Sequence, residues 1–248
     1  MPRIKLIIAY DGSGFEGYQI QPKGRTVQGE LEQALSVIHK GEAVRVHASG
    51  RTDAGVHASG QVVHFDTPLG IPDGRWAMAL NTRLPGAIRV LSAETVPDRF
   101  HARFSATGKT YRYIWHLSEV ISPFRRYFTT PSLGVTPDVA KMEEGARHLI
   151  GTHDFTSFCS AKTDVEDKVR TVESIRFERH GEELHMVITG SGFLYNMVRI
   201  IAGTLWMCGK GELDPAGIPG ILAAKDRSKA GKTAQAQGLY LEKVRYGE

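Results

Sequence analysis

The first part of the chain shows blocks of apolar positions whose spacing changes from strand-like to helix-like. An apolar run over residues 4–10 ends at the turn-forming sequence Asp11-Gly12-Ser13-Gly14, which predicts a strand. Thr26 precedes apolar residues at helical spacing and Gly41 follows them, so we expect a helix to about His39 with Thr26 as its N-cap. The same criteria predict strands over 43–48 and 61–66, a helix over 74–83 and a strand over 88–94.

The second part of the chain repeats this order of elements. Residues 109–117 have the β-branched and aromatic content of a strand. Pro137 is expected to begin a helix that runs to about Ile150 and stops at Gly151. Strands are predicted over 172–179 and 184–189, a helix over 193–208 and a last strand over 239–244. Residues 215–237 are rich in Ala, Gly and Lys, which predicts a short helix and a mobile basic loop.

The order strand–helix–strand–strand, read twice, favours an α+β fold. Hairpin-like connections, in place of a strict β-α-β alternation, predict a mainly antiparallel sheet with helices on its outer face. We expect two similar α/β lobes, over residues 1–105 and 106–248. A chain of 248 residues is long enough to give each lobe a hydrophobic core.

Composition indicates a soluble protein of a reducing compartment, with 41% hydrophobic and 23% charged residues. The first residues lack the pattern of a signal peptide, and the apolar run over 190–209 is interrupted by Asn196, Arg199 and glycines, which disfavours a membrane span. Cys159 and Cys208 form no C-x-x-C pair, so neither a disulfide framework nor a cysteine-based zinc site is expected. We therefore expect a cytoplasmic protein.

The formal net charge of +4 favours an anionic partner, and the local distribution of charge is more informative than the sum. Between residues 99 and 113, basic side chains are interleaved with aromatic rings. Cations suit a phosphate backbone and flat rings suit unpaired bases, so this stretch fits RNA. A basic edge strand that faces water explains the same residues, and the stretch alone leaves both interpretations open.

The loop expected between the strands over 43–48 and 61–66 carries the most unusual residues. Glycines at 50, 55 and 60 bracket Arg51, Thr52 and Asp53, and they allow the backbone to turn sharply and approach a ligand. A neighbouring cation keeps a carboxylate ionised, as a nucleophile requires. A tight turn with a solvated arginine accounts for the same residue types, and both interpretations stay open at this point.

Arg199 is the only charged residue between Gly190 and Gly209. A buried guanidinium needs a carboxylate or phosphate partner, and Asp53 is a candidate. Alternatively, the side chain extends along the helix to reach solvent. The residues alone do not decide between these two.

Further segments accompany these residues in a fixed order along the whole chain. They are Tyr10-Asp11-Gly12 with Phe15, Gly17 and Gln19; Thr26-Val27-Gln28; Gly50-Arg51-Thr52-Asp53-Ala54-Gly55-Val56-His57-Ala58; Ala79-Leu80-Asn81; Phe100-His101-Ala102-Arg103; Tyr111-Arg112-Tyr113; Gly151-Thr152-His153-Asp154-Phe155; Arg170-Thr171; Gly192-Phe193-Leu194-Tyr195 with Met197-Val198-Arg199; and Gly238-Leu239. In these segments the sequence resembles the tRNA pseudouridine synthase A family. Tyr18 stands where many members carry Trp, which keeps an aromatic ring.

The resemblance implies a substrate, a reaction and a fold. Members convert uridine to pseudouridine at positions 38, 39 and 40 of the tRNA anticodon arm. The implied architecture is the two-lobed pseudouridine synthase fold, with a basic RNA-binding cleft and a homodimer that shares each tRNA. The reaction is an isomerisation that needs no cofactor and no metal. The histidines form no zinc-binding motif, so we expect them to be structural or to contact RNA.

The resemblance also assigns roles to single residues. Asp53 matches the catalytic aspartate, and Arg51 matches the arginine that helps to flip the target base. Tyr111 matches the tyrosine that stacks on the uracil and can serve in proton transfer. Arg199 matches the arginine that pairs with the catalytic carboxylate. Leu239 lies where members pack an aliphatic side chain on the base, and Phe100, His101, Ala102, Arg103 and Phe104 correspond to a segment that contacts tRNA.

Two other functions remain as alternatives. A non-catalytic RNA-binding module needs basic side chains but no ionised Asp53. A glycoside or nucleoside hydrolase uses a carboxylate at an anomeric carbon, and it needs a second carboxylate as acid or base in the same pocket. No second carboxylate stands out near Asp53 in the sequence, and Asp66 fits a surface position equally well.

Overall fold

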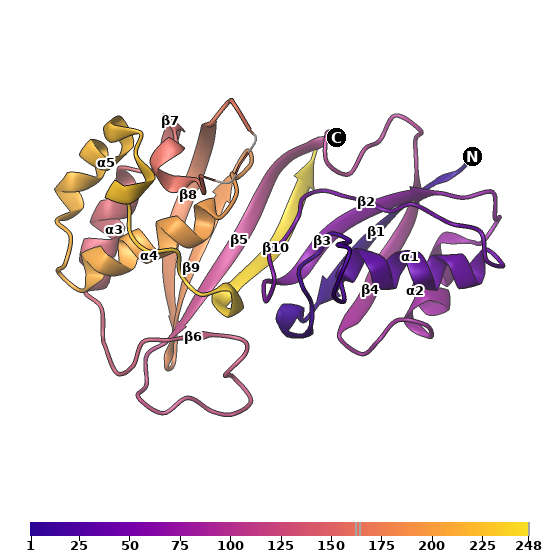
Figure 1. The fold of residues 1–248 in the computed structure, drawn as a ribbon, viewed down its shortest axis with the longest axis horizontal. Helices are drawn as coiled ribbons and strands as arrows, with labels where there is room; N and C mark the ends of the chain where they lie inside the picture. The colour runs from indigo at the N-terminus through magenta and orange to yellow at the C-terminus, as the bar shows by residue number, and fades with distance from the viewer. Residues whose placement is uncertain (162, 164, 248) are drawn as a thin grey trace. The chain divides into compact units, whose positions relative to one another are not determined.

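The sheet of the N-terminal part is built on β1 (Arg3–Tyr10), where every second side chain is buried. β1 pairs antiparallel with β3 (His57–Asp66) on one side and with β4 (Ile88–Val96) on the other. The short strand β2 (His47–Ala48) extends the sheet beyond β3. The computed structural model describes residues 1–161, 163 and 165–247 (Figure 1).

Two helices, α1 (Val27–Ile38) and α2 (Asp73–Asn81), contact each other over this sheet (Figure 1). The N-cap expected at Thr26 is confirmed, because its hydroxyl accepts a hydrogen bond from the N–H of Gly29. α1 buries Leu31 and Leu35, while α2 buries Trp76 and Leu80. The apolar stripes read from the sequence therefore face the core.

The C-terminal part of the chain contributes a run of four strands, which pair in the order β5 (Ala106–His116), β9 (Glu183–Gly190), β8 (Val169–His180) and β7 (Gly151–Asp154). All of its consecutive strands pair antiparallel, and β6 (Thr130–Pro131) adds a short parallel pairing to β5. Helices α3 (Val139–Arg147) and α4 (Met197–Gly209) contact each other, and α5 (Ile218–Ala224) follows. Trp206 of α4 stacks on Trp115 of β5 with ring centroids 5.3 Å apart. The expected α+β class with mainly antiparallel strands is confirmed.

The chain divides into two compact units, which we call unit 1 (Met1–Thr107 with Tyr240–Glu248) and unit 2 (Gly108–Leu239). The last strand, β10 (Leu239–Tyr246), belongs mostly to unit 1, because it pairs parallel to β3 at Tyr240 and Leu241. The sequence had placed these residues in the second lobe. The remaining short elements are 3-10 helices at Gly12–Gly14, Thr156–Phe158, Pro215–Gly217, Arg227–Lys229 and Ala236–Gly238.

Several expected element boundaries were wrong, and three of them have a clear local reason. The strand predicted over 43–48 is reduced to β2, because the N–H of Val46 donates to the carboxylate of Glu32 on α1. α3 begins after Pro137, since Asp138 is its N-cap and accepts from the N–H of Lys141. α4 begins at Met197 and not at residue 193, because Asn196 has a left-handed backbone with φ of 62°. The strands β6 and β7 were not expected.

Candidate active site

The loop between β2 and β3 lies in unit 1 and carries Arg51, Thr52 and Asp53. Arg51 is exposed, Thr52 is buried and Asp53 is half-buried. The N–H of Val56 donates to the carbonyl of Asp53 at 3.1 Å, which closes a turn through Gly55 with its φ of 77°. The tight turn expected for this segment is therefore present, and Asp53 lies at its start.

Thr52, which lies between Arg51 and Asp53, anchors this turn. Its hydroxyl is hydrogen-bonded to the hydroxyl of Tyr10 at 2.8 Å, and its carbonyl accepts from the N–H of Tyr18 at 3.0 Å. Gly17 makes the second contact possible, because a Cβ there would lie 2.8 Å from the same carbonyl. Burial raises the pKa of Tyr10 to about 12, so its hydroxyl stays protonated at neutral pH.

Gln61 of β3 holds the other side of the loop. Its side-chain amide donates to the carbonyl of Gly50 at 2.9 Å, and its side-chain oxygen accepts from the hydroxyl of Ser49 at 2.7 Å. Gln61 is fully buried. Polar groups that are buried and mutually hydrogen-bonded fix a conformation, so the backbone that carries Asp53 is held on both sides.

Tyr111, expected to stack on the uracil, lies in unit 2 on β5, opposite Ile188 of β9. Its side chain is 8% exposed and meets the ring of Phe193 edge-on, with centroids 5.2 Å apart. Gly190 lies beneath this pair, since a Cβ on it would be 3.2 Å from the Phe193 ring. The packing fixes the plane of the Tyr111 ring.

Arg199 lies on α4 of unit 2, and its guanidinium is held by the protein on two sides. Nε donates to the carbonyl of Ala234 at 2.7 Å, and Nη1 donates to the side-chain oxygen of Asn196 at 3.0 Å. The N–H of Ala234 returns a hydrogen bond to the carbonyl of Arg199 at 3.0 Å. The side chain is half-buried and does not simply extend into solvent. Leu239, buried at the start of β10, follows the segment that contains Ala234.

Arg51 and Asp53 thus share one loop of unit 1, whereas Tyr111, Arg199 and Leu239 belong to unit 2. The active site expected from the resemblance, including the pair between Asp53 and Arg199, stays a prediction. Each unit nevertheless holds its own part of that site with specific hydrogen bonds.

The segment from Phe100 to Phe104 forms a tight surface turn of unit 1. Ala102 is fully buried, its N–H donates to Nδ1 of His64 and its carbonyl accepts from the hydroxyl of Tyr246. Phe100 packs against Tyr246 with centroids 5.0 Å apart. The turn presents Arg103 and Phe104 to solvent, and the Phe104 side chain is 78% exposed. Phe100 and His101 are half-buried, so Arg103 and Phe104 are the most accessible side chains of this segment.

We predict that acid weakens unit 1 through His64. Burial, helped by nearby His101 and Arg3, lowers the pKa of His64 from 6.5 to about 4. The unfolded chain therefore takes up this proton near pH 6.5, while the folded protein resists it until about pH 4. The free energy of unfolding should fall as the pH drops through this window and level off below it. Urea titrations across pH 4 to 7 measure the slope.

The control for this prediction is His64→Asn, whose side-chain oxygen can accept the N–H of Ala102 but does not titrate. The variant should show a shallower loss of stability with acid than the parent protein. An equal slope in both proteins would contradict the assignment to His64.

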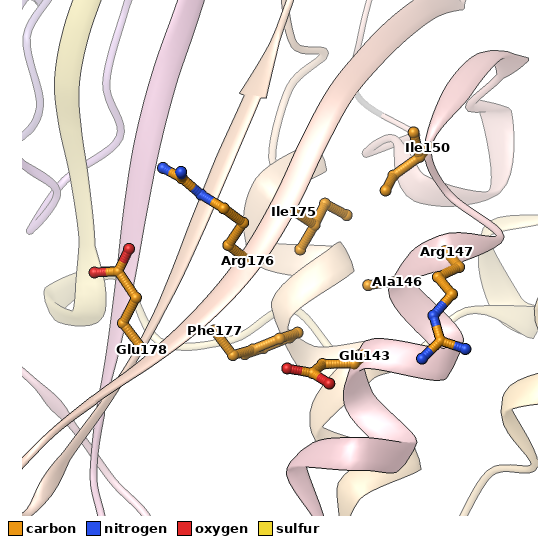
Figure 2. A pocket seen from close by; sticks show the side chains of 8 residues that line it. All are labelled: Glu143, Ala146, Arg147, Ile150, Ile175, Arg176, Phe177 and Glu178. Atoms are coloured by element: carbon orange, nitrogen blue, oxygen red, sulfur yellow. The ribbon is translucent and has the colours of Figure 1, made fainter.

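A groove in unit 2 is lined by none of the predicted site residues. It has a volume of about 410 Å³ between α3 and β8, and Figure 2 shows the side chains that line it. Its apolar floor includes Ile175 and Phe177, and charged side chains of both signs stand along it. It is lined by Glu143, Ala146, Arg147, Ile150, Ile175, Arg176, Phe177 and Glu178, and none of these is an expected catalytic or RNA-binding residue.

Comparison with known proteins bears directly on the loop of Asp53. A family model described as "tRNA pseudouridine synthase" matches residues 6–105 and 146–247. The chain is 60% identical to "tRNA pseudouridine synthase A" of Lysinibacillus sphaericus over 99% of this chain and 100% of the relative. It is 58% identical to the protein of the same name from Anoxybacillus flavithermus, over 99% of both chains. For that of Bacillus subtilis the identity is 54%, over 98% of this chain and 99% of the relative.

The chain belongs to the tRNA pseudouridine synthase family. The resemblance read from the ordered segments is thereby confirmed. The matched residues include the loop of Asp53, the turn at Phe100–Phe104, Arg199 and Leu239, while Tyr111 lies between the two matched ranges.

Several residues that hold the candidate site residues in place were not expected from the sequence. Tyr10, which holds the Asp53 loop, appeared among the ordered segments without a role, and Gln61 was expected only as the first residue of a strand. The sequence did not indicate that Asn196 and Ala234 orient Arg199. The acceptor of Ala234 is its backbone carbonyl, which a pattern of side chains does not reveal. The only signal for such supporting residues in the sequence was a side chain able to form hydrogen bonds next to a Gly-rich loop.

The cysteine thiols are a further class of reactive group in this chain. Cys159 and Cys208 are buried free thiols, and burial raises the pKa of both, that of Cys208 to about 11. Both thiols therefore stay protonated and are poor nucleophiles at neutral pH. Within residues 1–161, 163 and 165–247, no three His, Cys, Asp or Glu side chains converge as metal ligands. In the same residues no helix is long and apolar enough to cross a membrane.

Proposed function

We propose that this chain isomerises uridine to pseudouridine at positions 38, 39 and 40 in the anticodon arm of tRNA. The observation that carries the proposal is Asp53, a half-buried carboxylate on a turn locked from both sides, in a chain 60% identical to a protein named tRNA pseudouridine synthase A. A reacting group needs such preorganisation, because small displacements of a reacting group slow the chemistry strongly.

The proposed reaction exchanges one bond for another on the same nucleotide. The bond between C1′ and N1 breaks, the uracil rotates, and a bond forms between C1′ and C5. N1 gains a proton and C5 loses one, so no oxidant, reductant or group carrier is required. Asp53 serves either by attack on C1′ or by removal of a proton from the sugar, and its carboxylate suits both routes.

The other site residues have proposed roles that fit their surroundings. Arg51 is exposed on the same loop, where it can enter the base stack and favour flipping of the uridine. Tyr111, whose ring plane is fixed by Phe193, offers a flat face for the uracil and a hydroxyl for proton transfer. Arg199 is proposed as the cationic partner of the catalytic carboxylate, and Leu239 is proposed to pack on the base. Arg103 and Phe104 contact the tRNA backbone and an unpaired base.

Lysines of the segment 225–232 are proposed to add affinity for the tRNA backbone. Lys225 already pairs with Asp154 at 2.8 Å, and Arg227 donates to Ala230 and Thr233. Lys229 and Lys232 are exposed. Replacing both by alanine should weaken tRNA binding and flatten its dependence on log salt by about one unit per lysine.

Fluorescence titration of tRNA at several salt concentrations measures this slope. Lys141→Ala, at an exposed position of α3, is the control and should leave the slope within about half a unit of the parent value. A slope unchanged in the double variant would show that this segment does not contact the backbone.

The proposed function is tested with anticodon arms that carry a single uridine at position 38, 39 or 40, and with a control arm that carries it elsewhere. Nucleoside analysis should find pseudouridine in the first three only. Release of free uracil would instead indicate a nucleoside hydrolase, and binding without either product would indicate a non-catalytic module.

Two further proposals concern the setting of the enzyme. We expect a homodimer, as the resemblance implies, and a cytoplasmic location, as the sequence pattern indicates. Light scattering on the protein as it elutes from a size-exclusion column gives its mass. A monomer at all concentrations would contradict the proposed homodimer.

A further inference from the structure

His57 is the residue where the Asp53 loop meets β3. It is the first residue of β3 and its side chain is 1% exposed. It follows Val56, whose N–H donates to the carbonyl of Asp53. Its role is assigned neither by the proposed chemistry nor by the expected RNA contacts.

The first contact of the His57 ring is with the turn after β1. Nδ1 accepts the N–H of Gly12 at 3.1 Å, so this nitrogen carries no proton of its own. A carboxylate oxygen of Asp11 lies 3.3 Å from the same nitrogen, and it also accepts from the N–H and the hydroxyl of Ser13. A Cβ on Gly12 would lie 2.0 Å from the carbonyl of Val56, so the turn is pressed against the end of the loop.

The second contact of the ring is with β10. The rings of His57 and Tyr240 are nearly parallel, at an angle of 21°, with centroids 4.7 Å apart. The two residues are also paired in register between β3 and β10. Tyr240 directly follows Leu239, the residue expected to pack on the base. One buried ring therefore joins the Asp53 loop to two other segments of unit 1.

We propose that His57 is a positioning residue for Asp53, a role that rests on the proposed function. Gln61 fixes the loop at Gly50 and Tyr10 fixes it at Thr52. His57 holds the turn at Gly12, which in turn lies against the carbonyl of Val56 at the exit of the loop. With the ring removed, the exit can shift relative to the turn at Gly12. A displacement of about 1 Å at a reacting group lowers a rate by up to ~100-fold, while contacts to the distant parts of the substrate are unaffected.

Three variants separate the two contacts. His57→Asn keeps an acceptor near the position of Nδ1 and loses the stack on Tyr240. His57→Phe keeps the ring and loses the acceptor. His57→Ala loses both. We expect kcat to fall by about 10-fold in each of the first two and by up to ~100-fold in the third, with the Kd for tRNA unchanged.

His39 supplies a matched control for the general effect of removing a buried histidine. It is 5% exposed, its ring nitrogens are hydrogen-bonded to Leu35 and Thr67, and it lies nearly parallel to the ring of Trp76. Thr67 follows the far end of β3, about 30 Å from His57 at the rise of an extended strand. His39→Ala should lower the melting temperature as His57→Ala does and leave kcat within about two-fold of the parent value.

The measurements are kcat and tRNA Kd at a temperature where every variant is folded, together with the melting temperature of each. A loss of kcat confined to the His57 variants supports the proposal. Equal kcat values in the His57 and His39 variants, with the parent protein active, would overturn it. A parent protein that forms no pseudouridine would instead overturn the proposed function.

Discussion

Asp53→Asn is expected to abolish pseudouridine formation, with a rate at least ~10⁴-fold below that of the parent protein. The amide has almost the shape of the carboxylate but neither its charge nor its basicity, so it can neither attack C1′ nor remove a sugar proton. The turn should persist in the variant, because the backbone carbonyl of residue 53, Thr52 and Gln61 hold it. Single-turnover rates with enzyme in excess over an anticodon arm measure the loss. Binding of tRNA should remain within about three-fold.

Asp66→Asn is the matched control. Asp66 is an aspartate at the other end of β3, where it pairs with Arg3 at 2.7 Å. Its substitution should leave the rate within about two-fold of the parent value. An Asp53→Asn protein that keeps one tenth of the parent activity would contradict the assigned role of this carboxylate.

Arg199→Lys is expected to lower the rate by about 100-fold. The planar guanidinium donates from Nε to the carbonyl of Ala234 and from Nη1 to Asn196, and the proposal adds the carboxylate of Asp53 as a further partner. A lysine ammonium has one nitrogen on a flexible stem and cannot reach these acceptors together. The carbonyl of Ala234 then loses its donor, so the free energy of unfolding should also fall by ~1–2 kcal/mol.

The rate and the urea midpoint of Arg199→Lys are compared with those of Arg147→Lys, at an exposed position of α3. The control should change neither quantity beyond experimental scatter. If Arg199→Lys loses stability but keeps its rate within about three-fold, the residue orients the segment of Ala234 and does not support the chemistry.

Local signals predicted most of the elements of this fold. The apolar run of β1, the Thr26 cap of α1 and the stop at Gly41 depend on neighbours within a few residues, and all of them are present. The parallel pairing of β10 with β3 joins His57 to Tyr240, which lie far apart along the chain, and no pattern within either strand indicates it. The shortened β2 has a similar origin, because the competing acceptor for Val46 lies on α1.

The candidate site, too, could be predicted from the sequence only in part. Glycines and a short run of polar residues marked the loop of Asp53, and the turn is there as expected. The groups that hold the loop come from β1, from the turn at Gly12 and from the middle of β3, so they become neighbours only on folding. For Arg199 the sequence indicated that a partner was needed, but the carbonyl of Ala234 could not be foreseen.

The measurement that tests the central claim most directly uses tRNA that carries tritium at C5 of uridine. Forming the bond between C1′ and C5 expels the hydrogen at C5, so isomerisation at positions 38, 39 and 40 should release this tritium to water. We expect release by the parent protein, in proportion to the number of uridines at these positions, and none by Asp53→Asn. Tritium that stays on intact tRNA, or that leaves as free uracil, would contradict the proposed isomerisation.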